Sequence, residues 1–193
     1  FLKTDDGVKP YKLITSCSDI SQSGNYMLDR DITNPDVSSI DTCINIHDVG
    51  NIHIDCKDHT INSRKLIDIS RVHDFSLRNC NLEEPYIQGN SPVFLTISEA
   101  SNGIIINNNI GDFGIDVFKG SNLKIIRNNF KSFYQQHYSH DNIIEENTFH
   151  AANKEIKSGM IVLMYGKNNK IIKNNIDGGS DGIFIGPYDS IGA

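Results

Sequence analysis

The sequence lacks the features that would direct a protein to nucleic acid or into a membrane. Its 193 residues carry 24 acidic and 18 basic side chains, a formal net charge of −6, and no basic run exceeds two residues. Binding to nucleic acid requires a basic face that neutralises phosphates, so we expect no nucleic-acid partner. No apolar run approaches the length of a bilayer span and no signal peptide is visible, so we expect no membrane insertion.

Helical periodicity is also nearly absent, and a short repeat takes its place. The stretch Asn102–Ile110 (NGIIINNNI) returns 20 residues later as Asn122–Phe130 (NLKIIRNNF). Isoleucine, valine and phenylalanine alternate with polar residues in short runs, which indicates half-buried strands. A period near 20 is too short for a helix in every repeat. It favours one turn of a parallel β-solenoid.

The repeat can be followed through most of the chain. Asn or Asp opens each phrase at Asn51, Asp74, Asn102, Asn122, Asn142 and Asn168, and Ser190 has the same place at the end. Residues seven and five positions earlier form the two expected inward columns, which are Ile44, Ile67, Leu95, Ile115, Gln135, Ile161 and Ile183, and Ile46, Ile69, Ile97, Val117, His137, Leu163 and Ile185. Stacking at about 4.8 Å predicts about seven coils in a rod roughly 30–35 Å long.

A second asparagine column is predicted at a bend. Asn108, Asn128, Asn147 and Asn174 each lie two residues before an apolar residue. An asparagine side chain can donate to one coil and accept from the next, so a stacked column satisfies its own hydrogen bonds. We therefore interpret the asparagine richness as scaffold.

These phrases resemble the right-handed parallel β-helix repeats of the pectin-lyase-like superfamily, closest to its NosD-like and sugar-hydrolase branch. The opening stretches Ile14–Ile20, Ser23–Ile32, Cys43–Ile46 and Ile52–Ile61 are similar to the first coils of secreted members. The resemblance implies an all-β, right-handed parallel β-helix. It is weak for activity, because the superfamily includes lyases, hydrolases, epimerases and non-catalytic proteins.

We predict one β-helix domain over residues 13–193, preceded by a flexible lead-in at 1–12. Residues 13–42 form an N-terminal cap and loop, because an open solenoid end exposes core and strand edges. Residues 43–193 form the coils, and the last coil is incomplete. The open C-terminal edge is a candidate for self-association or for cover by a partner.

All four cysteines lie in the first 80 residues, where the cap and early coils need fastening. We predict a disulfide between Cys17 and Cys43. Cys56 and Cys80 are 24 residues apart, so they face each other on adjacent coils or are separately buried as small apolar residues. An even cysteine number in a family that is usually secreted favours an oxidising location: secreted, cell-surface or periplasmic.

The histidines raise the question of a metal, since the NosD-like resemblance suggests copper. His47, His53 and His59 are six residues apart, and a coil bends within that distance. His137 and His140, with Asp141, make a tighter group. Neither set has a metal-binding spacing, so we predict no metal and no cofactor.

The coil at 133–142 (FYQQHYSHDN) departs from its neighbours. Two interpretations are open: Gln135 and His137 point inward, or the register slips and Tyr134, Gln136 and Tyr138 do. Local rules are often broken where function requires it. Tyrosine, amide, histidine and carboxylate groups together suit sugar recognition.

The resemblance implies a substrate groove along the outer face of one parallel sheet. The expected outward columns there are Asn45, Asp68, Thr96, Asp116, Gln136, Val162 and Phe184, and His47, Ser70, Ser98, Phe118, Tyr138, Met164 and Gly186. The candidate catalytic residues are Asp116, His137 and Tyr138, with the Asp116 carboxyl as acid or base. The candidate substrate-binding residues are Asp68, Phe118, Tyr134 and Gln136.

The known catalytic strings of the superfamily are mostly missing: there is no GHG, no RIK and no Asp-Pro-His. We therefore favour a non-catalytic extracellular scaffold or glycan-binding module with polysaccharide as the partner. The alternative is a polysaccharide lyase, hydrolase or epimerase. NosD-like metal handling ranks third.

Overall fold

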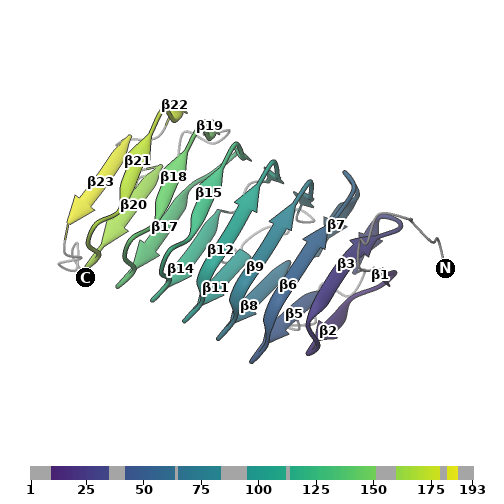
Figure 1. Cartoon of the computed structure of the whole chain (residues 1–193). Helices are drawn as coiled ribbons and strands as arrows, with labels where there is room; N and C mark the ends of the chain where they lie inside the picture. Colours follow the sequence, from purple (N-terminus) through teal and green to yellow (C-terminus); the bar gives the residue numbers. More distant parts are fainter. Residues whose placement is uncertain are drawn as a thin grey trace, which may run out of the picture.

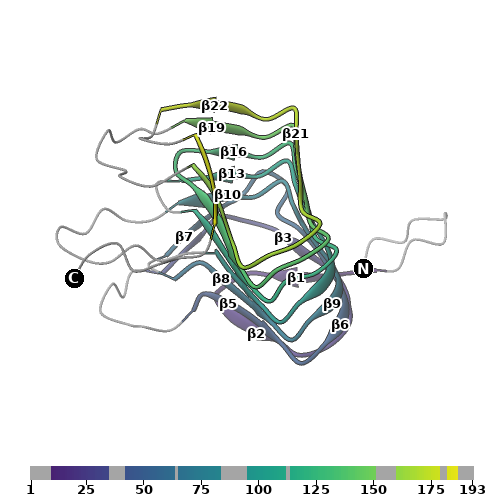
Figure 2. The same ribbon diagram turned by 90° about the vertical axis from the view of Figure 1, so that its left-hand side faces the viewer.

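In the computed structural model, the described residues are 10–34, 42–63, 65–83, 95–111, 114–150, 160–178 and 182–186. Within these ranges every regular element is a β-strand, and the strands form three parallel sheets. Figure 1 looks onto one sheet, and Figure 2 looks along the axis and shows a three-sided cross-section. The all-β solenoid expected from the repeat is confirmed.

The three sheets are named A, B and C. Sheet A contains β1 (Tyr11–Ile14), β3 (Gly24–Leu28), β6 (Gly50–Asp55), β9 (His73–Arg78), β12 (Ser101–Ile106), β15 (Lys124–Ile126), β18 (Ile143–Glu145) and β21 (Lys170–Ile172). Sheet B contains β2 (Ser18–Ile20), β5 (Ile44–His47), β8 (Ile67–Ser70), β11 (Leu95–Ser98), β14 (Ile115–Phe118), β17 (Tyr134–His137), β20 (Ile161–Met164) and β23 (Ile183–Gly186). Sheet C contains β4 (Ile32–Thr33), β7 (Thr60–Asn62), β10 (Asn81–Glu83), β13 (Asn109–Ile110), β16 (Asn129–Phe130), β19 (Thr148–His150) and β22 (Asn175–Asp177).

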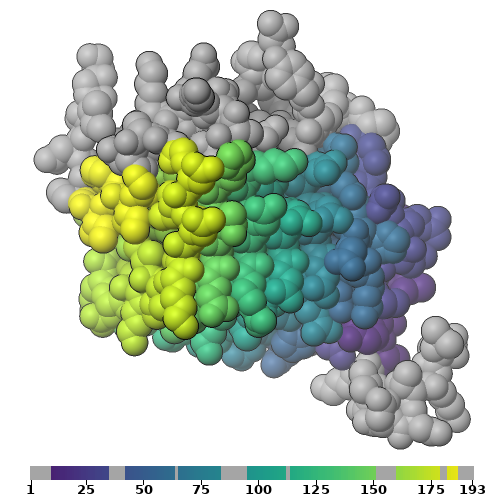
Figure 3. Space-filling view, turned by 90° about the horizontal axis from the view of Figure 1, so that it is seen from above, coloured from purple at the N-terminus to yellow at the C-terminus, as the bar shows by residue number. Residues whose placement is uncertain are grey.

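Each coil passes through sheet B, then sheet A, then sheet C, and the coils lie side by side as successive bands (Figure 3). Six complete coils, β5–β7 to β20–β22, follow the cap, and β23 begins another. The expected number of about seven was slightly too high, because only one strand of that last coil is described. The cap strand β1 pairs with β3 and begins at Tyr11, two residues before the predicted boundary.

Variation in coil length falls at one corner, between sheet C and the next strand of sheet B. Three residues separate β16 from β17, whereas 11 separate β10 from β11. All internal residues outside the described ranges lie at this junction. The other two corners keep nearly constant lengths, so the loop insertions expected from the variable spacing are confined to one edge of the rod.

The two constant corners explain why the chain needs so many left-handed backbone positions. All 19 non-glycine residues with positive φ among the described residues lie there. Between sheets B and A they form two columns: Asp48, Arg71, Glu99, Lys119, Tyr138 and Tyr165, and then Asn51, Asp74, Asn102, Asn122, Asp141 and Asn168. Between sheets A and C they are Lys57, Asp58, Asn79, Asn107, Arg127, Glu146 and Lys173. Asparagine and aspartate tolerate this conformation best, which explains the second column.

The predicted asparagine ladder is confirmed. The Asn108 amide nitrogen donates to Asn128 Oδ1 at 2.9 Å, Asn128 donates to Asn147 at 3.0 Å, and Asn147 donates to Asn174 at 2.9 Å. The Cys80 backbone N–H donates to Asn108 Oδ1, so the cysteine occupies the next place in the column.

Both pairs of cysteines are disulfide-bonded. The predicted Cys17–Cys43 bond is confirmed, and it ties the cap to β5. Cys56 and Cys80 are also bonded, which decides between the two alternatives for this pair. The second bond continues the line of the asparagine ladder into the early coils.

Candidate functional site

The departing coil, β17–β19, takes the slipped register. Tyr134 aligns with Ile115 on one side and Ile161 on the other, and Gln136 aligns with Val117 and Leu163. Ile115 and Tyr134 are 19 residues apart, one fewer than the repeat of 20 assumed from the asparagines. The inward placement of Gln135 and His137 was therefore wrong. The slipped alternative is confirmed for Tyr134 and Gln136 but was wrong for Tyr138, which lies at the corner and is 53% exposed.

The inward side chains of β17 are held by a buried polar network. The Tyr134 hydroxyl donates to Gln136 Oε1 at 2.8 Å, and the Asn142 amide donates to the same oxygen at 3.1 Å. Burial raises the pKa of the Tyr134 hydroxyl, so this group stays protonated. The two inward side chains of β17, Tyr134 and Gln136, are fully buried. Sequence reasoning placed Tyr134 and Gln136 as substrate-binding residues; the structure puts them in the interior, where they serve the scaffold.

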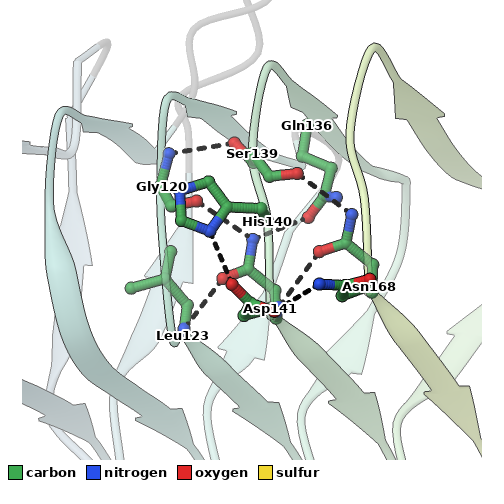
Figure 4. A network of polar contacts seen from close by, with 9 residues as sticks. Gly120, Leu123, Gln136, Ser139, His140, Asp141 and Asn168 are labelled. Carbon is green, nitrogen blue, oxygen red and sulfur yellow. Dashed lines mark hydrogen bonds and ion pairs between the residues drawn. The ribbon is translucent and has the colours of Figure 1, made fainter.

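The same network extends to the corner between sheets B and A (Figure 4). Asn142 Oδ1 accepts from the Leu123 backbone N–H at 2.8 Å, and Ser139 Oγ accepts from the Gly120 N–H at 2.9 Å. The Asn142 N–H donates to Asn169 Oδ1 at 3.0 Å. These bonds form a second, shorter ladder that satisfies most polar groups inside the C-terminal coils, although the buried Gln136 Nε2 has no hydrogen-bond partner within the described structure.

On the outer face of sheet B, the slip brings Asp116 and His137 together. Their strands β14 and β17 are neighbours, and His137 Nε2 lies 3.9 Å from Asp116 Oδ1. Burial raises the pKa of the Asp116 carboxyl, against the opposing effects of His137 and the Gln135 amide. Asp116 Oδ1 is buried and has no hydrogen-bond partner within the described structure. This half-buried carboxyl is suited to holding or exchanging a proton.

The predicted residue Asp68 lies on the same face but farther away. The register runs from Asp68 to Thr96 and then to Asp116 across β8, β11 and β14. Two strand steps separate the carboxylates by roughly 10 Å along the rod. Asp68 therefore belongs to the same face without touching the Asp116–His137 pair.

Three aromatic rings border this pair, which we call the aromatic row: Phe118, Tyr138 and Tyr165. They are 40%, 53% and 49% exposed. Phe118 and Tyr138 meet edge to face with centroids 5.8 Å apart, and Tyr138 and Tyr165 stack at 4.9 Å with planes 8° apart. Sequence reasoning missed Tyr165, although it follows β20 as Tyr138 follows β17 and occupies the same corner column.

The face is closed beside the aromatic row. Val162 and Met164 point outward by register, yet they are only 7% and 2% exposed. The accessible part of the site is therefore Asp116, His137 and the three rings.

His140, considered with His137 for a metal, belongs to a different corner contact. Its Nδ1 lies 2.7 Å from Asp141 Oδ2, and Asn168 donates to the other Asp141 oxygen at 3.0 Å. Across the part of the chain that the structure describes, no three His, Cys, Asp or Glu residues gather closely enough to hold a metal ion.

None of the described segments includes a helix long and apolar enough to cross a membrane. Comparisons with family models, curated proteins and solved structures gave no significant match. The fold and the geometry of the outer sheet-B face are therefore the basis for a functional proposal.

Proposed function

We propose that this protein is an extracellular β-helix module, secreted or displayed at a cell surface or in a periplasm, that binds a glycan along sheet B. The observation that carries the proposal is the aromatic row beside the Asp116–His137 pair. The resemblance to pectin-lyase-like repeats supports the same face. The two disulfides support an oxidising location.

The chemistry of this face suits a sugar chain better than a compact apolar ligand. Tyr138 and Tyr165 cover each other's faces, so the row offers mainly exposed ring edges as apolar contact for a sugar chain, and tyrosine hydroxyls offer hydrogen bonds at the rim. The Asp116 carboxyl and the His137 imidazole can bond sugar hydroxyls. Because the rings follow successive coils, they favour a polymer that runs along the rod.

A polysaccharide-active enzyme is the second candidate, favoured by one observation. A carboxyl whose pKa is raised by burial, with an imidazole 3.9 Å away, is a plausible acid–base pair. No second carboxyl is adjacent within the described residues, so a two-carboxylate hydrolase would need Asp68, roughly two strand steps distant. We keep binding as the proposed function and catalysis as an outcome of its test.

A glycan array should be screened with the wild type, Tyr138→Ala/Tyr165→Ala and Asp116→Asn. Tyr11→Ala is the control, because Tyr11 is an exposed tyrosine on sheet A. We expect wild-type and control binding to the same acidic or neutral polysaccharides, and at least tenfold weaker binding by the double variant.

Hits should then be assayed for reducing ends and unsaturated products. If the wild type forms product and Asp116→Asn binds the glycan without forming product, the protein is an enzyme and the proposal of a non-catalytic binding module is wrong. If no glycan binds the wild type, or if the double variant binds equally well, the sheet-B proposal is wrong. Self-association through the edge formed by β21, β22 and β23 is a separate prediction, which concentration-dependent sedimentation checks.

A further inference from the structure

The outer face of sheet A carries isoleucines that the core does not need. On β12, β15 and β18 the inward side chains are Ile105, Ile125 and Ile144, all buried. Isoleucines also occupy outward positions on these strands; Ile104 is 39% exposed, and Ile106, Ile126 and Ile143 are partly exposed. We call these four residues the isoleucine face. Lys124 lies between Ile104 and Ile143 in one outward column, while Ile106 and Ile126 are direct neighbours in the other. Exposed apolar side chains gathered on a sheet mark an interaction surface.

The isoleucine face lies on β12, β15 and β18, the fifth to seventh strands of sheet A, which faces the viewer in Figure 1. Charged residues lie on both sides of it. Arg78 on β9 precedes it and Glu145 on β18 follows it, in the same outward column as Ile106 and Ile126. Arg78 also contacts the buried Asp55 carboxylate at 3.1 Å, but its side chain is 46% exposed and has donors to spare. Glu145 makes no ion pair with any described residue.

We propose that this face binds a second copy of the chain, sheet A against sheet A, with the two rods antiparallel. A two-fold axis parallel to the strands, between β12 and β15, reverses the order of coils and keeps each position along the strand. Ile106 then faces Ile126 of the second copy, and in the other outward column Ile104 faces Lys124 of the second copy. Arg78 faces Glu145 of the second copy, one coil farther out on each side, so two ion pairs flank the apolar centre.

The charge pattern selects this register over its neighbours. Moving the axis onto β15 sets Lys124 against its own copy, which is unfavourable, and sets Arg78 against Ile172. Moving it onto β12 sets Arg78 against Ile126. Both shifts lose the two pairs between Arg78 and Glu145. Packed sheets lie about 10 Å apart and cross at about 30°, so the central isoleucines make the tightest contacts.

The dimer uses a different sheet from the proposed glycan site, so the two proposals fail independently. Sedimentation equilibrium of the full chain over about 1–500 µM tests the dimer, a range that covers weak and moderate affinities. We expect a monomer–dimer equilibrium for the wild type. Glu145→Arg should weaken it at least tenfold, because two arginines then face each other, and Arg78→Glu should do the same.

The decisive variant is Arg78→Glu/Glu145→Arg, which restores opposite charges and should return the dimer to within about threefold of the wild type. Glu83→Arg, at an exposed site on sheet C, is the matched control and should not change the equilibrium. Ile126→Lys tests the apolar centre without disturbing the Arg78–Asp55 contact, and it should give a monomer with unchanged circular dichroism.

A wild type that stays monomeric over the whole range overturns the proposal. So does a dimer that withstands Ile126→Lys, which would place the contact elsewhere, for example at the edge of β21–β23. Arg78→Glu also removes the ion pair with the buried Asp55, so the double variant must first show wild-type circular dichroism. A folded double variant that does not recover the dimer lost in Glu145→Arg would also reject the antiparallel register.

Discussion

The early and the late coils solve the same problem, closing a bend on adjacent coils, with different chemistry. In the early coils the bend between sheets A and C is joined by the Cys56–Cys80 disulfide, and in the late coils by the asparagine ladder. The corner between sheets B and A also differs between early and late coils. In the early coils its residues alternate in charge, as Asp48, Arg71, Glu99 and Lys119, whereas in the late coils Tyr138 stacks on Tyr165.

The interiors differ as well. From β5 to β14 the inward positions of sheet B are aliphatic, whereas β17 buries Tyr134 and Gln136 with a hydrogen-bond network. Hydrogen bonds to the Gln136 oxygen constrain these side chains more than an aliphatic stack would, although Gln136 Nε2 has no hydrogen-bond partner within the described structure. The Asp116–His137 pair and the aromatic row lie across the boundary between the two interiors, with Asp116 and Phe118 on β14 and His137 on β17. The inward side chains of the late coils are thus more constrained than those of the early coils, and the residues on the outer face of the same strand are held in defined positions.

The largest expected effect on stability comes from a substitution in the middle of the asparagine ladder. Asn147→Ala removes an amide that donates to Asn174 and to the Ile125 carbonyl and accepts from Asn128. Several buried groups lose partners, so we expect the free energy of unfolding to fall by about 4 kcal/mol. Denaturant unfolding measures this, with the exposed Asn129→Ala as a control expected to change it by less than about 0.5 kcal/mol. Equal effects of the two changes would contradict the structural role of the ladder.

Removal of the Cys56–Cys80 disulfide should lower the free energy of unfolding somewhat less, and it should act on the early coils. Cys56→Ala/Cys80→Ala opens a link across 24 residues, which predicts a loss of about 3 kcal/mol. Hydrogen exchange should show lost protection in β6 and β9 and little change in β18 and β21. Uniform loss along the rod would show that early and late coils unfold as one unit.

The smallest effect is a contrast in pH dependence between the Asp48 corner of the first coil and the Asp116–His137 pair. Bonds from Arg71, and secondarily from His47, lower the pKa of Asp48 to about 2, so its stabilisation is present above pH 3.8 and is lost as the pH falls toward 2. Burial raises the pKa of Asp116, so its ionisation destabilises the fold as the pH rises above 3.8.

Asp48→Asn should therefore be less stable than the wild type at neutral pH and equal to it near pH 2. Asp116→Asn should be equal to the wild type below pH 3.8 and more stable at neutral pH. Unfolding curves at several pH values measure both differences, and Asp58→Asn controls for the loss of one exposed charge. Shifts of the same sign in both variants would remove the contrast between the two sites.

The sequence carried enough information for the solenoid, the ladder and the Cys17–Cys43 bond, because each depends on periodicity or on a residue type with one structural use. The register of β17 could not be fixed, because Asp141 and Asn142 are adjacent and either suits the left-handed position. The structure uses Asp141 there and buries Asn142. A one-residue change then reverses every side chain of the strand.

The positions of the candidate site residues on the fold were predicted in part for the same reason. Asp116 and Phe118 were placed on the correct face because β14 has an unambiguous alternation. Tyr138 and Tyr165 lie outside the strands, at left-handed corner positions where alternation says nothing about direction. The one sequence signal that could have placed Tyr138 and Tyr165 in the same column is that a tyrosine follows each of two consecutive sheet-B strands.

The left-handed column that contains these tyrosines has a broader consequence. Its members are aspartate, arginine, glutamate, lysine and tyrosine, so the backbone accepts side chains of any charge there, and each is exposed. The column is thus a row of sites at a fixed spacing of about 4.8 Å whose identities can change without repacking the interior. Selection or protein engineering can therefore change the surface along this column one residue at a time while the folded core stays the same.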